Sequence, residues 1–175
     1  MQQGLIHIYE GNGKGKTTAG VGLALRCAGH GFPVVYSQFL KDGSSGEIGL
    51  LRQIPQITVM VNEKSFGFTF RMNEKQKKEA TGSYETLLES VIRQTVSDGC
   101  RLLVLDEVLD ACNCGMVSTE RLVDFLKQKP EELEVVMTGR NPAQELVELA
   151  DYITYMKKIK HPFDRGIYAR EGIEH

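Results

Sequence analysis

The sequence predicts an α/β fold of three layers, in which helices cover both faces of a mainly parallel sheet. Short apolar runs alternate with segments of helical pattern along the chain, which is typical of right-handed βαβ crossovers. The runs at 103–105 and 135–137 are apolar at every position, as expected for central strands buried on both faces. At 175 residues, the chain is expected to form one domain that spans residues 1–175.

The same patterns place the elements in order. Strands are expected at 5–9, 34–38, 57–61, 101–105, 134–138 and 152–156. Helices are expected at 17–30, 46–53, 73–98, 119–127 and 142–149, with a further one beginning near Leu109. Ser118 is the expected N-cap of the helix at 119–127, and Asn141 that of the last helix, with Pro142 in its first turn. Residues 157–175 are expected to form an ordered tail over the surface.

Composition narrows the class of protein. Hydrophobic residues make up 41% of the chain and charged residues 25%, which is typical of a globular domain. The net charge of −2 gives no electrostatic reason to expect nucleic acid or an anionic membrane as a partner. We expect a cytoplasmic protein, since no signal peptide and no apolar run near 18 residues is present. The four cysteines are expected to be free thiols, and the pair Cys112 and Cys114 lacks the spacing of common zinc and redox motifs.

A glycine-rich loop follows the first expected strand and leads into the first helix. It consists of Gly11, Asn12, Gly13, Lys14, Gly15, Lys16, Thr17 and Thr18. In such a loop, backbone N–H groups point at the phosphates of a nucleotide, the Lys adds a positive charge and the Thr hydroxyl reaches Mg²⁺. The expected fold is therefore a three-layer α/β/α domain similar to P-loop NTPases of the RecA-like type.

This loop is one residue shorter than usual. Glu10 stands where the pattern G-x-x-x-x-G-K-[ST] has its first glycine, so the loop begins at Gly11. An ordinary glycine-rich turn with an incidental lysine is the alternative. The required order of strand, loop, Gly-Lys-Thr and helix makes that alternative weak. The shortening argues against ordinary phosphoryl transfer, not against nucleotide binding.

Two carboxylates follow the apolar run at 102–105. At the carboxyl end of a parallel strand, Asp106 would face the phosphate loop and help to hold Mg²⁺, directly or through water. Glu107 could be a second ligand or a base. The alternative, that both residues only cap the next helix, loses weight because the phosphate loop is present.

Other residues have two open interpretations. Arg140 follows a strand end and could neutralise a phosphate or carboxylate, or be a solvated surface residue; Lys41 has the same two interpretations. Three phenylalanines lie within residues 66–70. They could fill a gap in the core, or stand exposed on a loop and contact a flat, largely apolar second substrate.

Several motifs together resemble one family along nearly the whole chain. They are Gly-Asn-Gly-Lys-Gly-Lys-Thr-Thr (11–18), Gly-Leu-Ala-Leu-Arg (22–26), Gln-Phe-Leu-Lys (38–41), Gly-Phe-Thr-Phe (67–70), Leu-Asp-Glu (105–107), Thr-Gly-Arg (138–140) and Lys-His-Pro-Phe-Asp (160–164). In this order they are similar to the P-loop type of ATP:corrinoid adenosyltransferase. The phosphate loop alone is shared by many NTPases. The shortened loop together with Gly-Phe-Thr-Phe (67–70) and Lys-His-Pro-Phe-Asp (160–164) is far more specific to this family.

The resemblance implies a reaction. The Co(I) of a reduced corrinoid attacks C5′ of ATP, giving a cobalt–carbon bond to adenosine and inorganic triphosphate. It also implies that ATP lies reversed relative to most P-loop enzymes. Alternatives from other classes are a small-molecule kinase or ATPase, which would release ADP, and a non-catalytic nucleotide-binding or corrinoid-binding protein.

The resemblance also implies roles for single residues. Residues 11–17 resemble the triphosphate cradle, with Lys16 as its neutralising charge. Thr17 and Glu107 would position Mg²⁺, with Asp106 as a further candidate ligand. Arg26 would help to orient the nucleotide. Phe68 and Phe70 resemble the aromatic pair near the lower face of the cobalt, where they would displace the axial ligand and ease reduction of Co(II).

Three positions depart from the family pattern. Phe70 stands where Trp is commonest, only residues 1–4 precede the first strand, and Cys114 and Gly115 replace a common Tyr-Gly pair. These differences concern the corrinoid pocket rather than the nucleotide site. The resemblance further implies a homodimer and a reductase such as a flavodoxin as electron donor.

Overall fold

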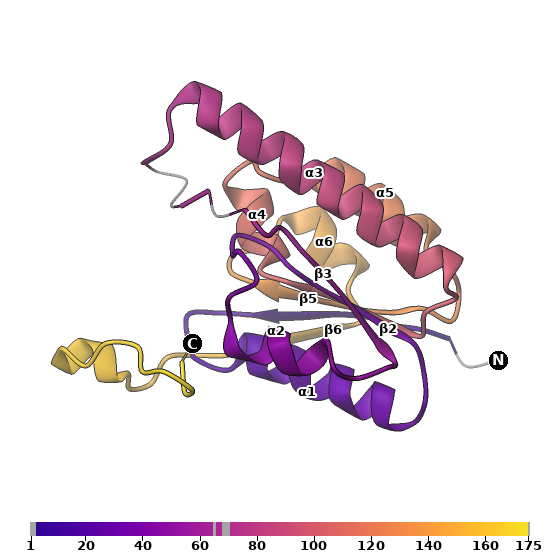
Figure 1. Ribbon diagram of the computed structural model, residues 1–175, viewed down its shortest axis with the longest axis horizontal. Helices are drawn as coiled ribbons and strands as arrows, with labels where there is room; N and C mark the ends of the chain where they lie inside the picture. The colour runs from indigo at the N-terminus through magenta and orange to yellow at the C-terminus, as the bar shows by residue number, and fades with distance from the viewer. Residues whose placement is uncertain (1–2, 65, 68–70, 175) are drawn as a thin grey trace.

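The chain forms a sheet with helices on both faces (Figure 1). The computed structural model describes residues 3–64, 66–67 and 71–174. Within these residues the strands are β1 (Ile6–Glu10), β2 (Val34–Gln38), β3 (Ile57–Val61), β4 (Leu102–Asp106), β5 (Glu134–Gly139) and β6 (Tyr152–Tyr155). They lie in the order β3-β2-β4-β5-β1-β6, and all of their recorded pairings are parallel. The expected α/β fold with a mainly parallel sheet is confirmed.

The helices divide between the two faces. On one face lie α1 (Lys16–Gly29) and α2 (Gly46–Leu51), and on the other α3 (Glu74–Ser97), α4 (Val108–Asn113), α5 (Thr119–Gln128) and α6 (Gln144–Leu149) (Figure 1). A short 3-10 helix, η2 (Pro162–Arg165), lies in the C-terminal tail. The architecture has three layers, as predicted.

Two hydrophobic cores explain the layers. Because successive side chains of a strand point to opposite faces, Leu103 and Val135 join the core under α3 to α6, while Val104 and Val136 join the core under α1 and α2. All four side chains are fully buried. The continuous apolar runs of the central strands therefore follow from burial on both faces.

Helix ends bear out one predicted cap and contradict another. Ser118 caps α5, since its hydroxyl accepts a hydrogen bond from the Arg121 N–H at 3.1 Å. The prediction for α6 was wrong: the helix begins at Gln144 with Ala143 as its N-cap. Asn141 has φ 46, a left-handed conformation. The chain is still turning away from β5 there, and a residue before proline is biased away from helical geometry.

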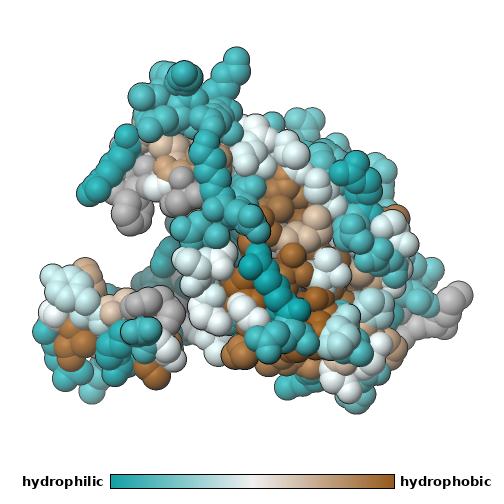
Figure 2. Space-filling model, viewed as in Figure 1, coloured by the Kyte–Doolittle hydropathy of each residue, from teal (hydrophilic) through white to brown (hydrophobic). Residues whose placement is uncertain are grey.

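The tail leaves the sheet after β6 and extends away from the body (Figure 1). In the same view, the surface is hollowed between the tail and the beginning of α3 (Figure 2). All four cysteines lie within the described residues and none of them forms a disulfide there, as expected. In the described part of the chain, we find no helix with the length and apolar character needed to span a membrane.

Candidate active site

The phosphate loop connects β1 to the N-terminus of α1. Gly11 and Gly15 have φ 120 and φ 113, values that side chains rarely adopt, so glycine is required at both positions. Gly15 is the N-cap of α1, and the helix begins at Lys16, so its first backbone N–H groups are directed toward the loop. The Lys16 ammonium donates to the carbonyl oxygens of Gly11 at 2.8 Å and Gly13 at 2.9 Å, which holds its charge inside the loop.

Asp106 lies beside this loop, as the sequence predicted. It ends β4 and is fully buried. Its Oδ2 accepts hydrogen bonds from the Thr17 hydroxyl at 3.2 Å and from the Gln38 amide at 3.1 Å, and its Oδ1 accepts from the Thr138 hydroxyl at 2.7 Å. These donors stabilise a carboxylate that burial alone would disfavour.

Sequence reasoning did not assign roles to Gln38 and Thr138. Gln38 is the last residue of β2 and Thr138 the second-last of β5, the two strands that flank β4, so their side chains meet Asp106 from either side. Gln38 also accepts from the Ser45 hydroxyl at 3.2 Å, which links Asp106 to the N-cap of α2. One sequence signal could have pointed to Gln38 and Thr138: each is a polar residue near the carboxyl end of a buried strand, where the site of an open parallel sheet lies.

Lys41 and Glu107 form an ion pair of 3.1 Å in the same site. Glu107 and Leu40, the residue before Lys41, both have φ 59, a strained conformation that is rare for residues other than glycine. Burial alone would lower the pKa of Lys41, but the carboxylates of Glu107 and Asp106 outweigh it and raise that pKa. Burial raises the pKa of the Glu107 carboxyl in spite of Lys41.

Arg140 approaches the site from the end of β5. Its guanidinium pairs with Asp110 at 3.4 Å, and its carbonyl accepts from the Asn113 amide at 2.7 Å. Burial lowers the pKa of Lys16, and the positive charge of Arg140 lowers it further. The structure therefore brings Arg140 into the electrostatic environment of the loop lysine.

Two predicted residues take other positions. Arg26 is exposed on the last turn of α1, ten residues or about 15 Å along the helix from Lys16, so the structure does not bring it to the loop. Thr18 lies in the first turn of α1, with its side chain exposed. Phe68 and Phe70 lie outside the described residues. Phe66, from the same aromatic cluster, is half-buried and packs against Tyr84, with ring centroids 5.7 Å apart.

The segment after β6 lies directly on the phosphate loop. The Gly13 N–H donates to the Met156 carbonyl at 2.7 Å, and the Asn12 side chain accepts from the Lys158 N–H at 2.9 Å. A Cβ atom at Gly11 or Gly13 would lie 2.5 or 2.6 Å from the Met156 carbonyl oxygen. These glycines thus allow the C-terminal segment to approach, in addition to any role toward an anion.

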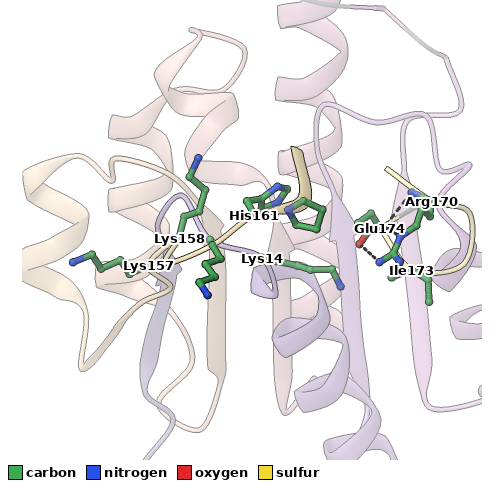
Figure 3. A pocket seen from close by; sticks show the side chains of 10 residues that line it. Lys14, Lys157, Lys158, His161, Arg170, Ile173 and Glu174 are labelled. Atoms are coloured by element: carbon green, nitrogen blue, oxygen red, sulfur yellow. Dashed lines mark hydrogen bonds and ion pairs between the residues drawn. The ribbon is translucent and has the colours of Figure 1, made fainter. Parts of the chain in front are cut away.

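A pocket of about 290 Å³ opens between the loop and the tail (Figure 3). Gly13 and Lys14 line it on the loop side, and the tail contributes the rest: Lys157, Lys158, Lys160, His161, Pro162, Arg170, Ile173 and Glu174. In Figure 3, Lys14 reaches from the loop toward Arg170 and Glu174, which are joined by an ion pair. We call this cavity the tail pocket.

The site fits a magnesium ion only together with phosphate oxygens. Among the described residues, no group of three or more His, Cys, Asp or Glu side chains is arranged to hold a metal ion. Thr17 and Asp106 nevertheless lie side by side at the loop, 3.2 Å apart. Mg²⁺ in proteins is commonly bound by one or two such groups, the phosphates of a nucleotide and water.

Comparison with known proteins gives a family match over the chain. A family model described as ATP:corrinoid adenosyltransferase BtuR/CobO/CobP matches residues 2–175. A corrinoid adenosyltransferase from Sinorhizobium is 34% identical over 99% of this chain and 81% of its own length, and one from Pseudomonas aeruginosa is 32% identical over 99% and 84%.

Solved structures resemble the fold at low sequence identity. EssC (ATPases 2 and 3) from Geobacillus thermodenitrificans matches with a TM-score of 0.51 and 15% identity, over 97% of this chain and 35% of its own. A KaiC-like protein from Pyrococcus horikoshii matches with a TM-score of 0.52 and 12% identity, over 91% and 76%. These likenesses support the predicted P-loop architecture.

Proposed function

This chain belongs to the ATP:corrinoid adenosyltransferase family BtuR/CobO/CobP, and from that premise we propose which residues perform its reaction. The enzyme is an alkyl-group transferase that moves the 5′-deoxyadenosyl group of ATP to the cobalt of a reduced corrinoid and releases triphosphate. The observation that carries our proposal is the convergence of Lys16, Thr17 and Asp106 at one loop. The family match does not favour a small-molecule kinase or a non-catalytic binding protein.

The phosphate loop binds the leaving group. In this reaction the whole triphosphate departs, so negative charge grows on the oxygen that links the phosphates to C5′. Cations and backbone N–H groups aimed at the phosphates stabilise that charge more in the transition state than in the ground state. Lys16 is the central cation of the loop, and Lys14, Lys41 and Arg140 add positive charge around it.

Thr17 would hold Mg²⁺ against the phosphates, and Asp106 would support it from behind. The ion supplies charge neutralisation when bound. Asp106 spends both oxygens on the hydroxyl and amide donors described above, so we assign it to position Thr17 and metal-bound water rather than to direct contact with the ion. Glu107 is the further carboxylate at this edge, and Lys41 balances its charge.

Phe68 and Phe70 retain their proposed role beside the corrinoid. Their substitution by alanine should leave ATP affinity intact and slow adenosylation. The hollow between the tail and the beginning of α3 in Figure 2 supports a large second substrate. Unchanged turnover in both variants would refute the assignment.

We further propose that residues 1–175 act as one domain in the cytoplasm, as a homodimer. Reduction of the corrinoid to Co(I) needs an external electron donor, for which a flavodoxin-like reductase is our proposal. One sheet built from β1 to β6 supports the single domain. Exposed apolar side chains on β6 and the tail, including Tyr155, Ile159 and Phe163, support the dimer.

Anaerobic incubation with Co(I) corrinoid and ATP tests the function. We expect the absorbance change of a new cobalt–carbon bond and one inorganic triphosphate for each adenosyl group transferred. Lys16→Ala should reduce the rate at least about 100-fold, because the loop loses its central cation. Release of ADP and phosphate, without an organocobalt product, would show a kinase or ATPase instead.

A further inference from the structure

We propose that the tail pocket is a subsite for the terminal phosphate of ATP and for the same end of the released triphosphate. This inference rests on the proposed function, since it concerns the same nucleotide. It assigns binding roles to tail residues, above all Lys160, with Arg170 and Glu174 setting the charge of the subsite.

The pocket is a built feature of the fold. Three hydrogen bonds hold the first tail residues against the loop: Met156 N–H to the Glu10 carbonyl at 2.8 Å, Gly13 N–H to the Met156 carbonyl at 2.7 Å, and Lys158 N–H to Asn12 at 2.9 Å. The phosphate loop and the pocket thus share a wall, formed by Gly13 and Lys14. An anion chain that starts in the loop reaches this pocket next.

The charge of the pocket is strongly positive, although the chain carries a net charge of −2. Its lining includes five Lys or Arg side chains and one carboxylate, Glu174. Arg170 holds the pKa of Glu174 down to about 2, so that carboxylate is ionised at neutral pH and neutralises Arg170. Lys158 pairs with Asp164 at 2.9 Å. The remaining lysines of the lining, Lys14, Lys157 and Lys160, have no recorded ion pair within the described residues.

Size and lining select the group that binds. A volume of about 290 Å³ admits a phosphate group and its water but not a corrin ring. The lining contains no Phe, Tyr or Trp side chain on which adenine could stack. Nucleobase sites are mostly apolar, whereas clustered cations favour phosphate. The terminal phosphate therefore belongs on the tail side of the loop, which leaves the ribose toward the Lys41 side.

This placement gives the tail a role in the release of product. Triphosphate carries the same terminal group as ATP, so it remains bound to the loop and the tail pocket after the sugar has left. Pyrophosphate is one phosphate shorter, and the loop alone can hold it. The wild-type enzyme should therefore bind inorganic tripolyphosphate at least about tenfold more tightly than pyrophosphate, with an advantage that shrinks at high salt.

Two variants with opposite expected effects test the subsite by calorimetric titration of inorganic tripolyphosphate. Lys160→Gln removes a cation and should weaken binding by about tenfold. Glu174→Gln removes the carboxylate while its amide oxygen can still accept from Arg170, so binding should tighten by about threefold. A merely structural role of the tail would weaken binding in both variants.

Lys78→Gln serves as the matched control, because it removes the charge of an exposed lysine on α3. It should leave the affinities for tripolyphosphate and pyrophosphate unchanged. The subsite is wrong if Lys160→Gln leaves tripolyphosphate affinity unchanged, if Glu174→Gln weakens it, or if Lys160→Gln reduces only corrinoid affinity. Failure of the proposed function looks different: the titrations would follow our expectation, but no corrinoid would be adenosylated.

Discussion

The groups around Lys16 determine how readily its side chain carries a positive charge. Burial, and next Arg140, lower its pKa, while Asp110, Glu107 and Asp106 oppose that shift. Folding thus disfavours the ammonium form of Lys16. This cost is fully present below the lowered pKa and disappears as the pH rises from there through the ordinary lysine pKa. A bound triphosphate reverses the balance, since it supplies the negative charge that the loop lacks.

Binding of nucleotide should therefore take up protons at alkaline pH. Below the ordinary lysine pKa of about 10.4, part of the Lys16 population is neutral in the free enzyme and becomes charged when triphosphate binds. Calorimetry of ATP binding in buffers of different ionisation enthalpy should show uptake of a fraction of a proton on the acid side of the ordinary lysine pKa, and this uptake should shrink as the pH falls further. Lys16→Arg should abolish the uptake, because arginine does not titrate there; an equal uptake in that variant would contradict the assignment.

Some backbone conformations and side-chain contacts of the site could not be predicted from the sequence. Glu107 and Lys41 were selected because they follow strand ends, and the structure joins them. The left-handed φ of Glu107 and of Leu40 was not predictable, because neither residue type favours it. Side-chain contacts between distant segments carry no local pattern either: the bond between Asn12 and Lys158 spans 146 residues of chain.

At the scale of elements, the effect of replacing a glycine depends on where it lies. Gly13 has no positive φ, so an alanine is acceptable to its backbone, but a Cβ would meet the Met156 carbonyl oxygen at 2.6 Å. Gly22, in the interior of α1, has nothing within 4 Å of its added Cβ. Gly22 therefore has a helical backbone and open space around it, whereas Gly13 lies in the loop against the tail segment.

Gly13→Ala should lower the free energy of unfolding by about 2 kcal/mol, because the tail segment must move off the loop. Gly22→Ala should raise it by about 0.5–1 kcal/mol, since alanine loses less conformational entropy in a helix. Urea denaturation measures both values. Gly13→Ala should also weaken ATP binding, and a variant as stable and as tight-binding as the wild type would show that the tail segment does not brace the loop.

The elements themselves were predictable because burial dictated their patterns. Strands β2 and β3 lie where the apolar runs placed them, and α5 begins at its predicted cap. The start of α6 was not predictable from Pro142, since a proline favours a first turn but equally suits the turn before it. A preference for one residue decides little where the preceding strand determines the path of the chain.

At the scale of the whole molecule, the sheet order explains why the site could be assembled in advance. Parallel strands all end at one edge, so the residues after β1, β2, β4 and β5 meet there whatever their separation in sequence. Strand order itself was not predictable, because the apolar runs look alike. For that reason Gln38 and Thr138 became visible only as neighbours of Asp106 in the structure.

The sheet has an open edge at β6. Within the described residues β6 pairs only with β1, and Ile153 and Tyr155 on it are 46% and 56% exposed. The strand carries no charge or proline of the kind that protects sheet edges. Two such edges related by a two-fold axis can pair with each other, and the exposed apolar side chains of the tail extend the same surface.

We therefore expect a dimer in sedimentation experiments, and we expect Ile153→Lys with Tyr155→Lys to shift it to a monomer by placing like charges across the axis. Leu50→Lys is the control, because Leu50 is 67% exposed on α2, away from this edge. Since the tail follows directly from β6 and forms the tail pocket, the monomeric variant should also bind tripolyphosphate more weakly. A monomeric wild type, or a double variant that remains dimeric, would exclude β6 as the interface.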